Sequence, residues 1–235
     1  MGRAGALRQE GVIVALVCTI VLVAACGGGD DEDTIGPPRT LPPTTSTVVL
    51  NETAARALQV QAAATGSLVG LPENPFATSE DPGEWAACGQ PLTVPDQRLL
   101  TSRRLFHIPD APPEESVEVT QITIVHRSAV AASTSMAAVF DLLSACPRAE
   151  TAGEVTEGWV VLPVPAGVSL DARAATATLT VTETEETYAS ALGCLTSGPV
   201  EQCVSVRTPT VEATNQWFAQ AFTATSEHLA EALIR

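Results

Sequence analysis

The sequence predicts an α+β fold: an antiparallel sheet packed by helices, with two disulfides, preceded by a disordered tether. Three observations predict it. Runs rich in β-branched residues are joined by connections too short for helical crossovers, which indicates antiparallel strands. Two long segments carry apolar residues at helical spacing. Cysteines follow an export signal, and exported proteins are where disulfides form.

The first 25 residues have the pattern of a bacterial lipoprotein signal peptide. Arg3 and Arg8 precede an apolar run from Gly11 to Ala25, and the sequence Val-Ala-Ala-Cys that ends at Cys26 resembles a lipobox. Secretory signals need a positive start, a short apolar centre and small residues at the cleavage site. We therefore expect Cys26 to carry a diacylglyceryl thioether and an acyl chain such as palmitate. The protein would then be lipid-anchored in the cell membrane, facing the outside of the cytoplasmic membrane.

The alternative for the same apolar run is an uncleaved transmembrane helix, but the run is shorter than the roughly 20 apolar residues that cross a bilayer. Residues 26–48 continue with glycines, an acidic run and a Pro/Thr-rich stretch without apolar periodicity. Such a segment cannot bury enough surface to fold. The predicted organisation is a signal peptide over 1–25, the lipidated Cys and disordered tether over 26–48, and an extracytoplasmic domain over 49–235.

The acidic composition limits the partners. The formal net charge is −15, which repels nucleic acid and anionic headgroups. The expected partners are the membrane, through the lipid anchor, and an extracytoplasmic small molecule, cell-wall component or protein. No cofactor is expected.

Four cysteines, Cys88, Cys146, Cys194 and Cys203, lie in the predicted domain. An even number in an exported domain indicates disulfides, and four cysteines allow three pairings. We favour Cys194–Cys203, because the turn-forming Ser-Gly-Pro over 197–199 lets the chain reverse between them. Cys88–Cys146 then follows by exclusion. There is no Cys-x-x-Cys pair and the three histidines are scattered, so no metal site is expected.

Three helices are expected. Asn51 is suited to cap a helix that starts at Glu52 and weakens near Gly66, and Ser128 caps a helix over 129–145 that Pro147 ends. Thr210 caps a final helix that lies on the sheet. The apolar stripe of the middle helix is Ala132, Met136, Val139, Phe140, Leu143 and Cys146. The stripe of the last helix is Val211, Phe218, Phe222, Leu229 and Leu233.

Strands are predicted over 117–125, 155–164, 174–183 and 202–207, where β-branched residues are frequent. The third run alternates almost perfectly, which predicts one packed and one wet face. Residues 72–82 are expected to form a loop from which Phe76 returns to the core. Leu92–Phe106 and Tyr188–Leu195 have no clear pattern.

This order of elements resembles the PknH-like extracellular sensor domain, found on actinobacterial serine/threonine kinases and on free lipoproteins. The likeness covers Trp85 to Arg235 and is carried by Ile122–Val125 running into Ser128, the helix end Leu142–Cys146, and the pair Cys194 and Cys203. The resemblance implies an α+β domain with two disulfides and a cleft for an extracytoplasmic ligand. The family helix often carries Trp shortly before its Cys, where this chain has leucines.

No hydrolase, zincin or phosphate-loop motif occurs. His228 is expected at the surface, and nothing nearby orients His107. His126, Arg127 and Ser128 lie where a strand meets a helix N-terminus, an arrangement that can bind an anion, although a plain surface turn explains the same residues.

The predicted function is a ligand-binding or sensor-like accessory domain without catalysis. The alternatives are a carrier that holds a lipid or glycolipid in an apolar cavity, and a hydrolase whose residues meet only in three dimensions.

Overall fold

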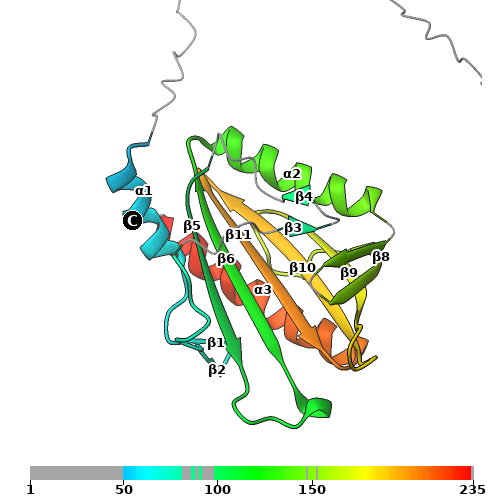
Figure 1. The fold of residues 1–235 in the computed structure, drawn as a ribbon. Coiled ribbons are helices and arrows are strands. Elements are labelled where there is room, and N and C mark those ends of the chain that lie inside the picture. The colour runs from blue at the N-terminus through cyan, green and yellow to red at the C-terminus, as the bar shows by residue number, and fades with distance from the viewer. Residues whose placement is uncertain are drawn as a thin grey trace, which may run out of the picture. The chain divides into compact units, whose positions relative to one another are not determined.

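The computed structural model describes residues 50–80, 86–87, 90–91, 98–146, 148–151 and 153–233. They lie in one compact unit, Ser46–Arg235. Its centre is a seven-stranded antiparallel sheet with the strand order β5-β6-β11-β10-β9-β8-β7 (Figure 1). The signal peptide, the tether, Cys26 and Cys88 lie outside the described residues.

The helices and strands of the described residues have the following bounds. The helices are α1 (Glu52–Ala62), α2 (Ala129–Ala145), α3 (Val211–Leu233) and the short 3-10 helix η2 (Pro113–Glu115). The sheet strands are β5 (Arg98–His107), β6 (Glu118–His126), β7 (Arg148–Thr151), β8 (Glu154–Leu162), β9 (Asp171–Val181), β10 (Thr187–Ser197) and β11 (Val200–Thr208). Two small hairpins pair β1 (Ser67–Leu68) with β2 (Leu71–Pro72), and β3 (Ala86–Ala87) with β4 (Gln90–Pro91). The predicted antiparallel sheet packed by helices is confirmed.

The hairpin formed by β10 and β11 is the centre of the sheet. Its turn includes Gly198 in the left-handed region (φ 55°), and Cys194 lies directly opposite Cys203 and forms a disulfide with it, as expected. Most residues of both strands are buried. Because both faces are covered, β10 lacks the alternation of apolar and polar residues that marks a half-exposed strand. For this reason residues Tyr188–Leu195 of β10 show no clear pattern in the sequence.

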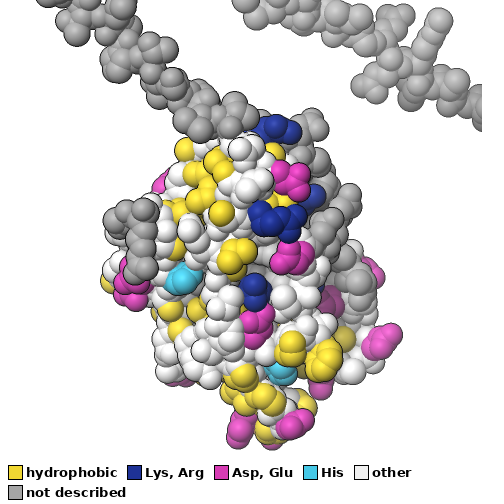
Figure 2. All heavy atoms as spheres, turned by 90° about the vertical axis from the view of Figure 1, so that its left-hand side faces the viewer, with side chains coloured by type: hydrophobic (Ala, Val, Ile, Leu, Met, Phe, Trp, Pro, Cys, Tyr) yellow, Lys and Arg dark blue, Asp and Glu magenta, His cyan; other side chains and the backbone are white. Residues whose placement is uncertain are grey.

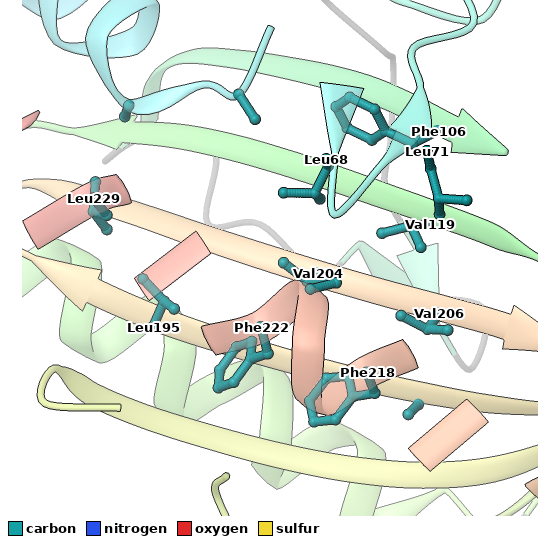
Figure 3. Close-up of a cluster of buried hydrophobic side chains, with 14 of the residues drawn as sticks. Leu68, Leu71, Phe106, Val119, Leu195, Val204, Val206, Phe218, Phe222 and Leu229 are labelled. Carbon is teal, nitrogen blue, oxygen red and sulfur yellow. The ribbon is translucent and has the colours of Figure 1, made fainter. Parts of the chain in front are cut away.

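One face of the sheet packs against α1 and α3. Phe218 and Phe222 of α3 stack with ring centroids 5.0 Å apart and lie near Leu195 and Val204 of the sheet (Figure 3). Gly193 of β10 faces these rings: a Cβ added there would lie 2.6 Å from Phe218 Cζ and 2.7 Å from Phe222 Cε2. The absence of a side chain at Gly193 therefore lets α3 approach the strand.

The other face packs against α2. The expected stripe of α2, including Met136, Val139, Phe140 and Leu143, is buried against Ile122 and other side chains of β6, β9, β10 and β11. Ser128 caps this helix as predicted, because its hydroxyl accepts a hydrogen bond from the Ala131 amide.

Residues 73–79, which follow β2, lie along the β5 edge of the sheet. They form isolated bridges at Glu73, opposite Phe106, and at Ser79, opposite Arg103. Glu73 also pairs with Arg104 at 2.6 Å. Figure 2 shows basic and acidic side chains alternating down this side of the molecule.

The predicted burial of two apolar residues, Phe76 and Val211, is wrong. Phe76, expected to return to the core, is 97% exposed, because the chain between the two bridges turns outward over residues 74–77. Val211, assigned to the buried stripe of the last helix, is exposed at the first position of α3, three residues before Thr214, whose hydroxyl donates to the Ala189 carbonyl of β10. Phe218, Phe222 and Leu229 are buried as predicted.

Replacing Gly193 with Ala should lower the free energy of unfolding by about 1–3 kcal/mol, because the new methyl group overpacks the contact with α3. Urea denaturation measures the loss. In a Phe218→Leu background the same substitution should cost less, because the nearer ring is gone. An equal cost in both backgrounds would contradict this account of the glycine.

Candidate ligand-binding site

A row of polar residues crosses the sheet on the face that α2 partly covers. His107 of β5 lies opposite Glu118 of β6, Glu118 lies opposite Arg207 of β11, and Arg207 lies opposite Ser190 of β10. Residues directly opposite in an antiparallel sheet share a face. Successive even positions of β6 place Glu118 on the same face as Ile122, which contacts α2.

Beside this row lies a pocket of about 480 Å³. The connection between β5 and β6 forms one wall, with His107, Asp110 and Glu118. Tyr188 and Arg207 form another part of the wall. The volume falls within the range of about 300–1,000 Å³ typical of small-molecule sites, and the side chains provide both hydrogen-bond donors and acceptors.

Arg207 and Tyr188 hold each other in place. The Arg207 guanidinium carbon lies 4.2 Å from the centroid of the Tyr188 ring, and Nη1 donates a hydrogen bond of 2.7 Å to Glu154 Oε1. The Tyr188 hydroxyl donates to Glu186 Oε2 at 2.9 Å. The cation–π contact and these two hydrogen bonds fix the geometry of the wall before any ligand arrives.

Glu186, which accepts the hydrogen bond from the Tyr188 hydroxyl, also changes the pKa of this hydroxyl. The hydrogen bond to Glu186 is the main cause that raises the pKa of Tyr188 above its ordinary value of 10.0. Burial and the negative charge of Glu186 act in the same direction, and Arg207 opposes them. The phenol is therefore a neutral hydrogen-bonding group at physiological pH.

His107 lines the pocket, and one nitrogen of its ring is unsatisfied. Its Nδ1 is buried and has no hydrogen-bond partner among the residues that the structure describes. A buried polar atom without a hydrogen bond carries a free-energy cost. No local sequence pattern selects His107, because Glu118 and Arg207 become its neighbours only through strand pairing.

Asn74 also lines the pocket, and its neighbour in the chain, Glu73, is fixed by several hydrogen bonds. Burial disfavours the Glu73 carboxylate, but hydrogen bonds from the Gly66 amide, the Thr78 hydroxyl and the Arg104 guanidinium outweigh burial and hold its pKa below the ordinary 4.5. The stability that Glu73 contributes is thus complete above about pH 4.5 and is lost as the pH falls through the lowered folded-state pKa.

A second polar pair lies under α2. His126 Nε2 lies 2.8 Å from Glu201 Oε2, and both side chains are 0% exposed. The other histidine nitrogen, Nδ1, has no hydrogen-bond partner among the described residues. Complete burial keeps this pair away from any dissolved substrate.

The three residues of the predicted anion site have different surroundings. The His126 side chain is directed to Glu201 inside the protein, and the Ser128 hydroxyl caps α2. Arg127 is exposed. The His126 and Ser128 side chains are therefore directed to partners within the protein.

The remaining predicted site residues are cysteines and a histidine. Cys194, Glu201 and Cys203 offer ligand atoms within 4.8 Å of one another, but the disulfide occupies both sulfurs, so neither is a thiolate for a metal. Cys146 lies at the C-cap of α2, and its predicted partner Cys88 lies outside the described residues. His228 is exposed, as expected, and its Nε2 lies 3.0 Å from the Gln61 carbonyl.

The described structure therefore defines an α+β domain with a cross-strand disulfide and a polar surface pocket. None of the helices it describes is long and apolar enough to cross a membrane.

No family model matches the chain, and no curated protein matches it. Among solved structures, the chain is similar to the extracellular domain of PknH from Mycobacterium tuberculosis. The identity is 15% and the TM-score is 0.44, over 80% of this chain and 93% of that chain.

The chain contains a single tyrosine, so the ultraviolet absorbance of the phenolate reports Tyr188 alone. We expect its pKa above 10.0 in the folded protein. Glu186→Gln should lower it towards 10.0, because the charged acceptor is removed. Glu183→Gln, an exposed change in the same turn, is the control and should leave it unchanged. Equal shifts in both variants would contradict the assigned hydrogen bond.

Proposed function

We propose that this protein is a lipid-anchored, extracytoplasmic domain that binds a small polar ligand without catalysis. One observation carries the proposal: the cross-strand row of His107, Glu118 and Arg207 lies beside a pocket of suitable size. The row presents the positive group of Arg207 and the negative group of Glu118 to a ligand that enters, and His107 lines the same pocket.

The disulfide supports a location outside the cytoplasm. Cys194 and Cys203 are buried and bonded at the centre of the sheet. Disulfides persist in oxidising compartments and are rare where thiols are kept reduced. The lipobox-like sequence ending at Cys26 and the Pro/Thr-rich tether agree with this location.

The surroundings of the histidines favour binding over catalysis. A nucleophilic hydrolase needs a base in hydrogen-bond reach of a hydroxyl or thiol. Within the described part of the chain, the Nδ1 atoms of His107 and His126 have no hydrogen-bond partner, and Nε2 of His126 is paired with Glu201. These observations support a binding role for the pocket and a structural role for the buried pair.

The lipid anchor is tested by labelling cells that express the full chain with radioactive palmitate. We expect the label to be incorporated and the protein to be found in the membrane fraction. Cys26→Ser should abolish labelling, because the thiol that receives the lipid is removed. Cys18→Ser, which changes a cysteine within the signal peptide, is the matched control and should keep the label. Labelling that survives Cys26→Ser would contradict the anchor.

The ligand site is tested with the chain from Gly27 to Arg235, which keeps the compact unit whole. N-acetylglucosamine, D-alanyl-D-alanine and inorganic phosphate are added in turn, and nuclear magnetic resonance follows the three histidine rings. We expect at least one probe to shift His107 saturably while the exposed His228 stays unchanged. Glu118→Gln should weaken that shift.

Two results would oppose the proposal. His107 could stay unmoved by all three probes, or His107 and His228 could shift together. Native mass spectrometry of protein purified without detergent then tests the alternative function, a carrier of lipid or glycolipid. A retained mass of lipid size would favour the carrier function.

A further inference from the structure

The two edges of the seven-stranded sheet differ in how they are covered. The β5 edge is covered by the segment with bridges at Glu73 and Ser79. At the other edge, β7 pairs only with Glu154–Glu157 of β8. Among the described residues, no strand pairs with the outer side of β8 from Gly158 to Leu162, a segment that we call the open edge.

The open edge is apolar and accessible. Val160 is 60% exposed and Val161 is 72% exposed. Adjacent residues of a strand point to opposite faces, so solvent reaches the strand from both sides. Trp159 and Leu162 pack against the two core clusters and hold the strand to the domain.

Few of the usual devices that protect an edge strand are present here. Proteins blunt exposed edges with charged side chains, prolines, bulges or covering segments. The sequence from Gly158 to Leu162 contains no charged residue and no proline. The register shifts between Glu157 and Val160, and Gly158 has a φ of 68° there. This irregularity lies where β7 stops pairing, and Pro163 limits the edge at its other end.

We propose that the open edge pairs, antiparallel, with the open edge of a second copy of this chain. Antiparallel pairing about a two-fold axis places the same apolar stretch against itself, so that each copy provides what the other lacks. Unpaired strand edges recruit partners in this way, through backbone hydrogen bonds and alternate side-chain contacts. The inference stands independently of the ligand pocket.

The local charges permit two copies to approach. The chain has a net charge of −15, but two acidic side chains in this part of the sheet pair with arginines of the same chain. Glu157 pairs with Arg148 at 3.4 Å, and Asp141 pairs with Arg173 at 4.0 Å. Both ion pairs are exposed, so a second copy that approaches this part of the sheet meets charges that are already paired.

The short length of the open edge limits the expected affinity of the dimer. Five paired residues bury far less than the about 1,200 Å² of a stable interface. The dimer should therefore be weak in solution. Two copies anchored in one membrane would have a higher effective concentration, which favours the same contact.

Sedimentation velocity of the chain from Gly27 to Arg235, over about 10 μM to 1 mM, tests the proposal. We expect a monomer–dimer equilibrium within this range. Val161→Lys should weaken dimerisation at least about tenfold, because a charge enters the pairing edge. Val130→Lys, at a valine of α2 that is 76% exposed, is the matched control and should leave the equilibrium unchanged.

Val160→Lys tests the other face of the same strand and should also weaken the dimer. Circular dichroism confirms that each variant is folded. A chain that stays monomeric at about 1 mM overturns the proposal. So does a dimer that both edge variants leave intact, or one that Val130→Lys weakens equally.

Discussion

The burial of the β10–β11 hairpin on both faces is the constraint on which the rest of the structure depends. On one face the aromatic rings of α3 pack directly against the backbone of β10, and this close contact requires a residue without a side chain at Gly193. The other face holds the Cys194–Cys203 disulfide beneath α2. A hairpin in this position cannot expose backbone groups to water, so β6 and β9 must pair with its outer sides.

Buried polar groups orient the layers around this hairpin. Gln121 of β6 accepts from the Ala64 amide at 2.9 Å and donates to Thr225 of α3 at 3.3 Å. Gln202 of β11 donates to the Ala62 carbonyl at the end of α1. Apolar contacts are tolerant of small rotations, whereas these directional bonds favour one placement of α1 and α3. On the opposite face, the pair of His126 and Glu201 has the same effect near the start of α2.

The pocket follows from how far α2 reaches. Its side chains cover the part of the sheet around Ile122 and leave the row at Glu118 and Arg207 uncovered. Glu118 is exposed there, so its charge stays in contact with water and remains available to a ligand. The same sheet thus provides a rigid support and a chemically varied surface, which is the usual way in which a site is added to a fold.

The sequence by itself determined the local features: the capped starts of α1 and α2, the β6 strand, the antiparallel arrangement and the Cys194–Cys203 bridge. These depend on propensity, periodicity and a turn within a few residues. Tertiary structure alone decided that His107, Glu118 and Arg207 share a row, that Phe76 faces water, and that β10 is a strand. Each depends on strand register or two-sided packing between distant segments, which no local pattern encodes.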